Sequence, residues 1–284
     1  MASAAPLKHS VRLADGIECP AFGMGTWRMG EAKATRAAEI AALQAGLDAG
    51  VKLIDTAEMY GEGEAETIVA AAMAGRRDDV FVVSKVYPHN ASRAGTVAAC
   101  ERSLKRLATD RIDLYLLHWP GRHPLEETVA GFEQLKRAGK IRSWGVSNFD
   151  ISEIEALGRI AGGEACATNQ VLYNLARRGI EGGLAAACAK RKMPIMAYSP
   201  LDQARIPRKA ALADVARRHN ASQAQIMLAW AARDPTTIVI PKATGTAHLA
   251  ENIAAMALRL DAADLAILDA AFPPPRGVTP LEML

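Results

Sequence analysis

Four polar residues provide a carboxylate, a phenol, an ammonium and an imidazole, which together suit proton-transfer chemistry. Asp55, Lys85 and His118 each stand where a short apolar run ends, and Tyr60 follows Asp55 by five residues. In a barrel of parallel strands the carboxyl ends share one rim, so residues far apart in the sequence meet around one pocket. The pattern therefore predicts a proton-transfer site on such a rim.

Each of these residues also has an ordinary structural explanation. A lysine commonly extends along a surface to solvent, an aspartate often caps a helix, and a lone histidine after an apolar run is often a core residue. Four suitable groups at neighbouring strand ends are harder to explain by packing and capping together. A buried Lys85 beside Asp55 would also lower the pKa of a nearby phenol, which predicts that Tyr60 is an acid near neutral pH.

Apolar runs of strand character alternate with alanine-rich stretches of helical period, as is typical of parallel βαβ units. The expected strands span residues 21–25, 52–55, 80–85, 112–118, 141–147, 167–170, 194–199 and 236–241. Residues 205–234 leave room for two helices. This rhythm predicts a (β/α)8 TIM barrel that occupies residues 1–284 as one domain.

Two features outside these units bear on the fold. Short runs at residues 11–13 and 17–19 flank the turn dipeptide Asp15-Gly16 and predict an N-terminal β-hairpin that caps the bottom of the barrel. The alternative is a doubly wound sheet, whose dinucleotide fingerprint is a glycine-rich turn after the first strand. Residues 22–27 offer only Gly-x-Gly there, so the barrel is favoured.

Composition excludes several functional classes. Half of the 284 residues are hydrophobic, and 34 basic against 31 acidic residues give a net charge of +3, with no electrostatic footprint for nucleic acid. The four cysteines are too widely separated for a zinc site or a disulfide scaffold. The first eight residues lack the apolar core of a signal peptide, and no segment is long enough to span a membrane. We therefore expect a cytoplasmic, monomeric protein without a metal.

Longer motifs surround the four residues. They are Asp-Thr-Ala-Glu-Met-Tyr-Gly at 55–61, Val-Ser-Lys-Val at 83–86, Leu-Leu-His-Trp-Pro at 116–120, Trp-Gly-Val-Ser-Asn-Phe at 144–149, Asn-Gln at 169–170, Tyr-Ser-Pro-Leu at 198–201, Ile-Pro-Lys-Ala at 240–243 and Glu-Asn at 251–252. In identity, order and spacing they resemble the aldo-keto reductases over nearly the whole chain. The short loops look most like the small bacterial branch grouped with diketogulonate reductases.

The resemblance implies a catalytic role for each of the four residues. Tyr60 is similar to the family's proton donor, Asp55 and Lys85 to the pair that tunes it, and His118 to the residue that orients the carbonyl. Hydride would pass from a dihydronicotinamide to the carbonyl carbon of a small aldehyde or activated ketone, and no metal is needed. Because reduction creates negative charge on oxygen, a nearby phenol suits it as proton source.

The resemblance also implies a cofactor site without a Rossmann domain. It assigns Ser147, Asn148 and Gln170 to the nicotinamide carboxamide and Tyr198 to stacking on the ring. The remaining cofactor positions are Gly25, Thr26, Trp27, Asp55, Ser199, Pro200, Leu201, Ile240, Pro241, Lys242, Ala243, Thr244, His248, Glu251 and Asn252. The substrate pocket is expected among Trp27, Tyr60, Tyr87, His118 and Trp119.

Two departures from larger relatives affect cofactor choice and enclosure. Lys242 suits a 2′-phosphate and favours NADPH, but His248 stands where many NADPH-using relatives carry an arginine. An imidazole carries less charge at neutral pH, so discrimination against NADH is expected to be weaker. The loop after Tyr198 and the extended tail after Phe272 are short, which predicts a shallow pocket.

Two other functions remain open from the residues alone. A Schiff-base aldolase or lyase on the same barrel would use Lys85 as the nucleophile, although Asp55 would keep that lysine protonated. A regulatory protein that binds the cofactor without turnover would keep the cofactor positions and need no substrate.

Overall fold

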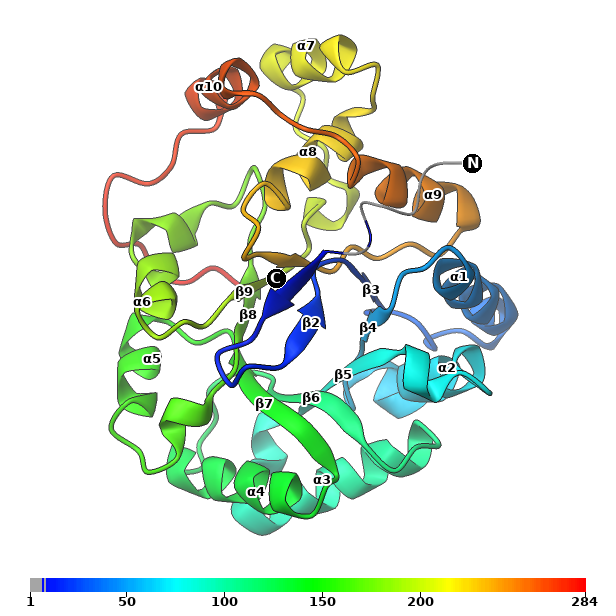
Figure 1. Cartoon of the computed structure of the whole chain (residues 1–284), viewed down its shortest axis with the longest axis vertical. Coiled ribbons are helices and arrows are strands. Elements are labelled where there is room, and N and C mark those ends of the chain that lie inside the picture. The colour runs from blue at the N-terminus through cyan, green and yellow to red at the C-terminus, as the bar shows by residue number, and fades with distance from the viewer. Residues whose placement is uncertain (1–6, 8) are drawn as a thin grey trace.

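Eight parallel strands form the centre of the molecule (Figure 1). The computed structural model describes residue 7 and residues 9–284. The strands are β3 (Gly23–Gly25), β4 (Leu53–Asp55), β5 (Phe81–Val86), β6 (Ile112–Leu117), β7 (Ile141–Ser147), β8 (Asn169–Leu172), β9 (Ile195–Tyr198) and β10 (Ile238–Val239). Each pairs with the next in chain order, and a parallel bridge between Phe22 and Val239 joins the first to the last. The predicted (β/α)8 barrel is thus confirmed.

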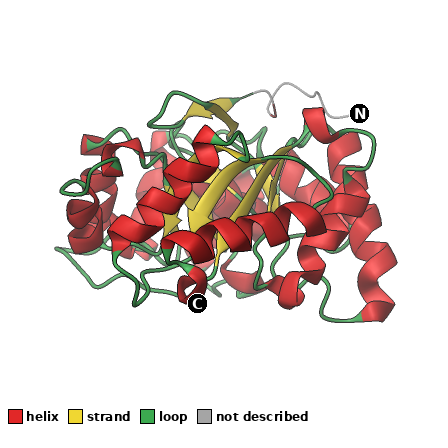
Figure 2. Ribbon diagram, turned by 90° about the horizontal axis from the view of Figure 1, so that it is seen from below, coloured by secondary structure: helices red, strands yellow, loops and turns green. Residues whose placement is uncertain are grey.

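Helices surround the strands on the outside (Figures 1 and 2). They are α1 (Arg36–Asp48), α2 (Glu64–Ala72), α3 (Arg93–Arg106), α4 (Leu125–Arg137), α5 (Ile151–Leu157), α6 (Leu184–Lys190), α7 (Ala210–Arg218), α8 (Gln223–Ala231), α9 (Thr246–Ala255) and α10 (Ala262–Ala271). The two helices predicted for residues 205–234 are α7 and α8. Residues 273–284 form neither helix nor strand, as expected of the tail.

The last strand is shorter than the sequence predicts. Instead of residues 236–241, only Ile238–Val239 pair as a strand. The preceding residues are held in a turn by Asp234, whose carboxylate accepts the Thr236 N–H at 2.8 Å and whose carbonyl accepts the Thr237 N–H at 3.0 Å. Pro241 has no N–H to donate, so pairing ends before it.

The N-terminal hairpin closes one end of the barrel, as predicted. Strands β1 (Ser10–Arg12) and β2 (Glu18–Pro20) pair antiparallel around Gly16, whose φ of 91° suits a glycine. The Ser143 hydroxyl, near the start of β7, donates to Asp15 Oδ2 at 2.7 Å, so the hairpin sits at the amino ends of the strands. Figure 2 shows the hairpin on one side of the barrel and the C-terminus on the other. The carboxyl rim therefore lies away from the hairpin.

No helix in the described residues is long and apolar enough to cross a membrane. Residues 1–6 and 8, which carry most of the segment lacking a signal-peptide core, lie outside the described part of the chain.

Candidate active site

Alternation along the strands directs three of the four polar residues into the barrel at its carboxyl end. Leu53, Val83 and Leu116 belong to the apolar cluster that fills the interior. Successive side chains of a strand point to opposite faces, so the residue two positions later points the same way. Those residues are Asp55, Lys85 and His118.

Tyr60 reaches the same rim through the loop that follows β4. The Thr56 N–H donates to Val83 O at 2.8 Å, and the loop then forms the 3-10 helix η3 (Tyr60–Gly63). Gly61 has a φ of 55°, and a Cβ there would lie 2.9 Å from Met29 O, so glycine is required by both conformation and space.

Lys85 joins the other residues of the site. Its Nζ donates to Asp55 Oδ2 at 2.8 Å, to Thr56 O at 2.8 Å and to Tyr60 OH at 3.3 Å. Lys85 is 0% exposed and Asp55 only 3%. An ammonium has three N–H donors, so all of them are used. The expected grouping of Asp55, Tyr60 and Lys85 is present in the structure.

Burial determines how these groups hold their protons. It raises the pKa of Tyr60 well above the usual phenol value, and the Asp55 carboxylate raises it further. Burial also lowers the pKa of Lys85, although Asp55 and Glu66 oppose that change. The expected lowering of the Tyr60 pKa is therefore not found in this structure, where desolvation and the Asp55 carboxylate set a raised pKa.

His118 lies beside Tyr60, and no described residue forms an ion pair with it. The two rings are 5.6 Å apart between centroids and nearly perpendicular at 72°. Burial, and secondarily the Lys85 charge, lowers the pKa of His118 well below its usual value, so the imidazole is neutral near neutral pH. Its Nδ1 atom is buried without a hydrogen-bond partner among the described residues.

Aromatic side chains adjoin His118. The Trp119 ring lies 4.9 Å from the His118 ring and 5.1 Å from that of Tyr87, between centroids. Tyr87 in turn contacts His89 at 4.3 Å. Tyr87, His118 and Trp119, which the sequence analysis placed in the substrate pocket, thus form one cluster.

A second group of predicted residues forms a hydrogen-bonded chain across the ends of β7, β8 and β9. Tyr198 OH donates to Asn148 Oδ1 at 3.0 Å, Asn148 Nδ2 to Ser147 Oγ at 3.2 Å, and Ser147 Oγ to Gln170 O at 2.8 Å. Gln170 Nε2 donates to Asp55 Oδ1 at 2.7 Å. This bond connects the series of hydrogen bonds to Asp55, Lys85 and Tyr60. Asn148 has a φ of 56°, a strained conformation of the kind that concentrates at functional sites.

A third group lies where β3 meets β10. The Gly25 N–H donates to Pro241 O at 3.0 Å, and a Cβ on Gly25 would lie 3.0 Å from Ile240 O. Thr26 donates from both its N–H and its Oγ1 to Asp55 O, each at 3.0 Å. These contacts connect the junction of β3 and β10, where the barrel closes, to Asp55.

Charges of both signs lie near Lys242, beside the junction of β3 and β10. Lys242 is half-buried, and burial lowers its pKa, with Glu39 and Glu31 opposing and the Arg28 cation adding to the decrease. The Arg28 guanidinium also lies 4.6 Å from the Trp27 ring centroid. Lys242 is thus a half-buried cation that an anionic group could contact.

The other predicted cofactor residues lie in the following loops and in α9. Ser199, Pro200 and Leu201 directly follow β9, and Ser199 has a φ of 48°. His248, Glu251 and Asn252 are on α9, where Asn252 is buried and the other two are exposed. Ala243 and Thr244 precede α9. No hydrogen bond in the described part of the chain joins these side chains to Asp55, Tyr60, Lys85 or His118.

The sequence analysis missed two contributors to the rim. Arg28 directly follows the Thr26-Trp27 pair, so extending that motif by one residue would have included it. The C-terminal tail gave no signal, yet its backbone at Leu284 affects the pKa of Tyr198, which burial raises to about 12. The tail is held by Leu281 N–H to Asp150 Oδ2 at 3.2 Å and by an Arg177–Glu282 ion pair at 2.7 Å.

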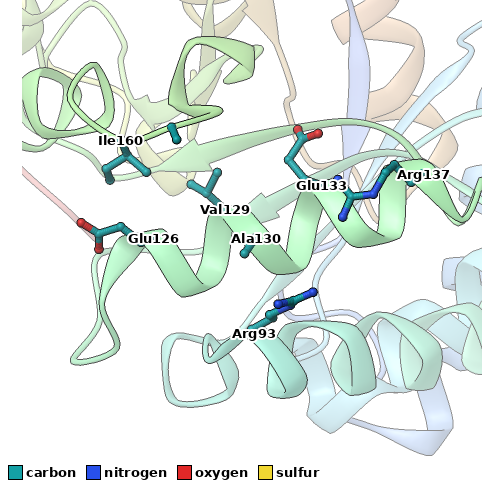
Figure 3. Close-up of a pocket in the computed structure, with 8 residues that line it drawn as sticks. Arg93, Glu126, Val129, Ala130, Glu133, Arg137 and Ile160 are labelled. Carbon is teal, nitrogen blue, oxygen red and sulfur yellow. The ribbon is translucent and has the colours of Figure 1, made fainter.

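A surface groove elsewhere does not compete with this site. It has a volume of about 450 Å³ and lies along α4 on the outside of the barrel, bordered by Arg93 of α3 and by Ile160 of the segment after α5 (Figure 3). Its lining residues include Arg93, Val129, Glu133 and Ile160. Glu133 accepts the Trp144 Nε1–H at 2.7 Å, so it already has a structural partner. None of the predicted site residues lies there.

Comparison with known proteins agrees with the motifs. The model of the Aldo/keto reductase family matches residues 21–272. Methylglyoxal reductase YeaE of Escherichia coli (strain K12) is 48% identical over 279 residues, covering 96% of this chain and 98% of the relative. Glyoxal reductase of Bacillus subtilis (strain 168) is 33% identical over 279 residues, with 98% of each chain covered. The crystal structure of an aldo-keto reductase from Klebsiella pneumoniae in complex with NADPH is 48% identical, covers 98% of this chain and 99% of that one, and superposes with a TM-score of 0.94.

The buried ion pair predicts a large, partner-dependent effect on stability. Lys85→Met leaves the Asp55 carboxylate buried without its cation, and we expect a loss of about 3–5 kcal/mol in the free energy of unfolding, measured in urea. Combining it with Asp55→Asn should cost less than the sum of the two single changes. As a control, Arg76→Met breaks an exposed pair with Asp48 and should cost less than about 1 kcal/mol. Equal losses in Lys85→Met and Arg76→Met would contradict the importance of the buried pair.

Proposed function

The chain belongs to the aldo/keto reductase family and is an NADPH-dependent carbonyl reductase, and we propose that it reduces small aldehydes and activated ketones such as methylglyoxal. The observation that carries this proposal is the contact of one buried ammonium, Lys85 Nζ, with both Asp55 and Tyr60. Two relatives are named for the reduction of methylglyoxal and of glyoxal, which are small and strongly electrophilic carbonyls.

Tyr60 acts as the proton donor in this proposal. The phenol is protonated at neutral pH, and it can give its proton to the carbonyl oxygen as negative charge develops there. The raised pKa of Tyr60 opposes this transfer, so the phenolate needs stabilisation from its neighbours. The phenolate that remains lies 3.3 Å from Lys85 Nζ, which stabilises it. Asp55 keeps the ammonium in place beside the hydroxyl.

His118 orients the carbonyl. A neutral imidazole can donate one hydrogen bond to the carbonyl oxygen without adding charge, and the lowered pKa of His118 keeps it neutral. Tyr87, Trp119 and Trp27 form apolar walls around the substrate in this proposal. Orientation of the carbonyl toward Tyr60 then lowers the entropic part of the barrier.

The side chains present fit a nicotinamide dinucleotide phosphate. Lys242 is a half-buried cation that a 2′-phosphate would contact, and Arg28 is a second cation acting on it, with Glu39 and Glu31 also nearby. Ser147, Asn148 and Gln170 would hold the carboxamide, Tyr198 the ring, and the residues of the β10 to α9 segment the adenosine half. When bound, the dihydronicotinamide supplies the hydride. We infer NADPH as the preferred form, with His248 limiting the discrimination against NADH.

No observation favours the other functions considered. All three N–H donors of Lys85 are engaged and the side chain is 0% exposed, which does not suit a Schiff-base nucleophile. All the site residues come from one chain, so we propose that a monomer is sufficient for activity. The four cysteines are free and buried, which supports our proposal of a cytoplasmic location.

Tyr60→Phe tests the proposed chemistry directly. It removes the proton donor and little volume, so kcat for methylglyoxal should fall by about 10²- to 10⁴-fold. NADPH affinity, measured by quenching of tryptophan fluorescence, should change little because the hydroxyl is the only group removed. A variant that folds, binds NADPH and retains most of the wild-type kcat would refute the role of Tyr60.

Lys242 and His248 lead to a prediction of how the protein distinguishes NADPH from NADH. Lys242→Met should raise KM for NADPH by about tenfold or more while changing KM for NADH much less, because only NADPH carries the 2′-phosphate. His248→Arg should lower KM for NADPH and widen the preference. The check is a parallel steady-state comparison of both cofactors, and equal effects on NADPH and NADH would rule out a 2′-phosphate contact.

A further inference from the structure

Gln170 contacts Asp55, which neighbours the proton donor Tyr60 through Lys85. It also contacts Ser147 and Asn148, which are assigned to the cofactor. It is 2% exposed on β8, and its Nε2 donates to Asp55 Oδ1 at 2.7 Å and to Met196 Sδ at 2.9 Å. Its backbone oxygen accepts the Ser147 hydroxyl at 2.8 Å and the Asn148 N–H at 2.9 Å. Strands β8 and β4 are not neighbours in the sheet, so the contact with Asp55 crosses the barrel interior.

The Asp55 carboxylate fixes the orientation of the Gln170 amide. An ionised carboxylate has no donor, so the NH₂ end of the amide must face Asp55. Both of its N–H donors are then used, by Asp55 and Met196. The Oε1 atom makes no hydrogen bond within the described part of the chain and is free to accept one.

We propose that Gln170 is a positioning residue that holds the Asp55 carboxylate toward Lys85. This inference rests on the proposed reductase function, and it adds a second task to the contact with the carboxamide, which Oε1 would make. The amide fixes one carboxylate oxygen, so the other remains directed at Lys85 Nζ at 2.8 Å. Lys85 in turn contacts the Tyr60 hydroxyl, and Gln170 therefore acts on proton transfer through two intermediate residues.

Gln170→Glu separates the two tasks, because it keeps an acceptor for the carboxamide and removes the donor to Asp55. With saturating NADPH and methylglyoxal, we expect kcat near neutral pH to fall at least about tenfold. Activity should recover toward about pH 6, because two adjacent carboxyl groups share a proton and the introduced group can then donate to Asp55. A matched control is Gln134→Glu on α4, whose Oε1 accepts from Arg93 at 3.3 Å on the exposed surface. It should keep the wild-type kcat and pH profile.

A measurement on the cofactor-free protein provides a second readout. Gln170→Met, Asp55→Asn and the double variant should show non-additive shifts of the urea midpoint, because the two side chains interact directly. Gln170→Met also covers the case in which Gln170→Glu does not fold. Its kcat at saturating NADPH should fall as well, whereas loss of a carboxamide contact alone would chiefly raise KM for NADPH.

The outcomes separate this inference from the proposed function. If the wild-type protein reduces no small carbonyl with NADPH, the proposed function fails. If the wild type is active but Gln170→Glu has a wild-type kcat with no recovery at low pH, the positioning role is overturned. Additive midpoint shifts in the cofactor-free cycle would overturn it too.

Discussion

The site depends on one buried ion pair, Lys85 with Asp55. Placing two charges inside a barrel is unfavourable unless each is paired and hydrogen-bonded. Here the ammonium uses its three donors on Asp55, Thr56 and Tyr60, and the second oxygen of Asp55 accepts from Gln170. Because every polar atom of the pair has a partner, the ammonium is fixed beside the Tyr60 hydroxyl, where a phenolate would form.

The barrel makes this arrangement possible through strand alternation. The side chains that fill the interior near the hairpin are apolar, and the same faces of β4, β5 and β6 end in polar residues at the rim. The hairpin closes one end of the interior, so the opposite end is the place where a substrate can enter (Figure 2). The apolar interior and the polar catalytic rim thus occupy opposite ends of one set of strands.

Much of this was predictable from local sequence, and the rest depends on contacts between distant segments. Strand-end positions and the (β/α)8 fold follow from periodicity, because alternation is a local property. The direction of the Tyr60 pKa was not foreseen, because burial inside the closed barrel and the Asp55 carboxylate both raise it. The Gln170–Asp55 contact joins residues 115 positions apart, and the C-terminal tail is held by Asp150 and Arg177 without any motif. Neither could be read from spacing.

The most direct test of the central claim is the activity of Lys85→Met. Steady-state reduction of methylglyoxal would be compared with the wild type, with NADPH binding and folding checked by fluorescence and circular dichroism. The account predicts that kcat/KM falls by about 10²-fold or more while NADPH still binds, because the phenolate loses its neighbouring positive charge. A folded, NADPH-binding Lys85→Met variant with the wild-type kcat/KM would contradict it.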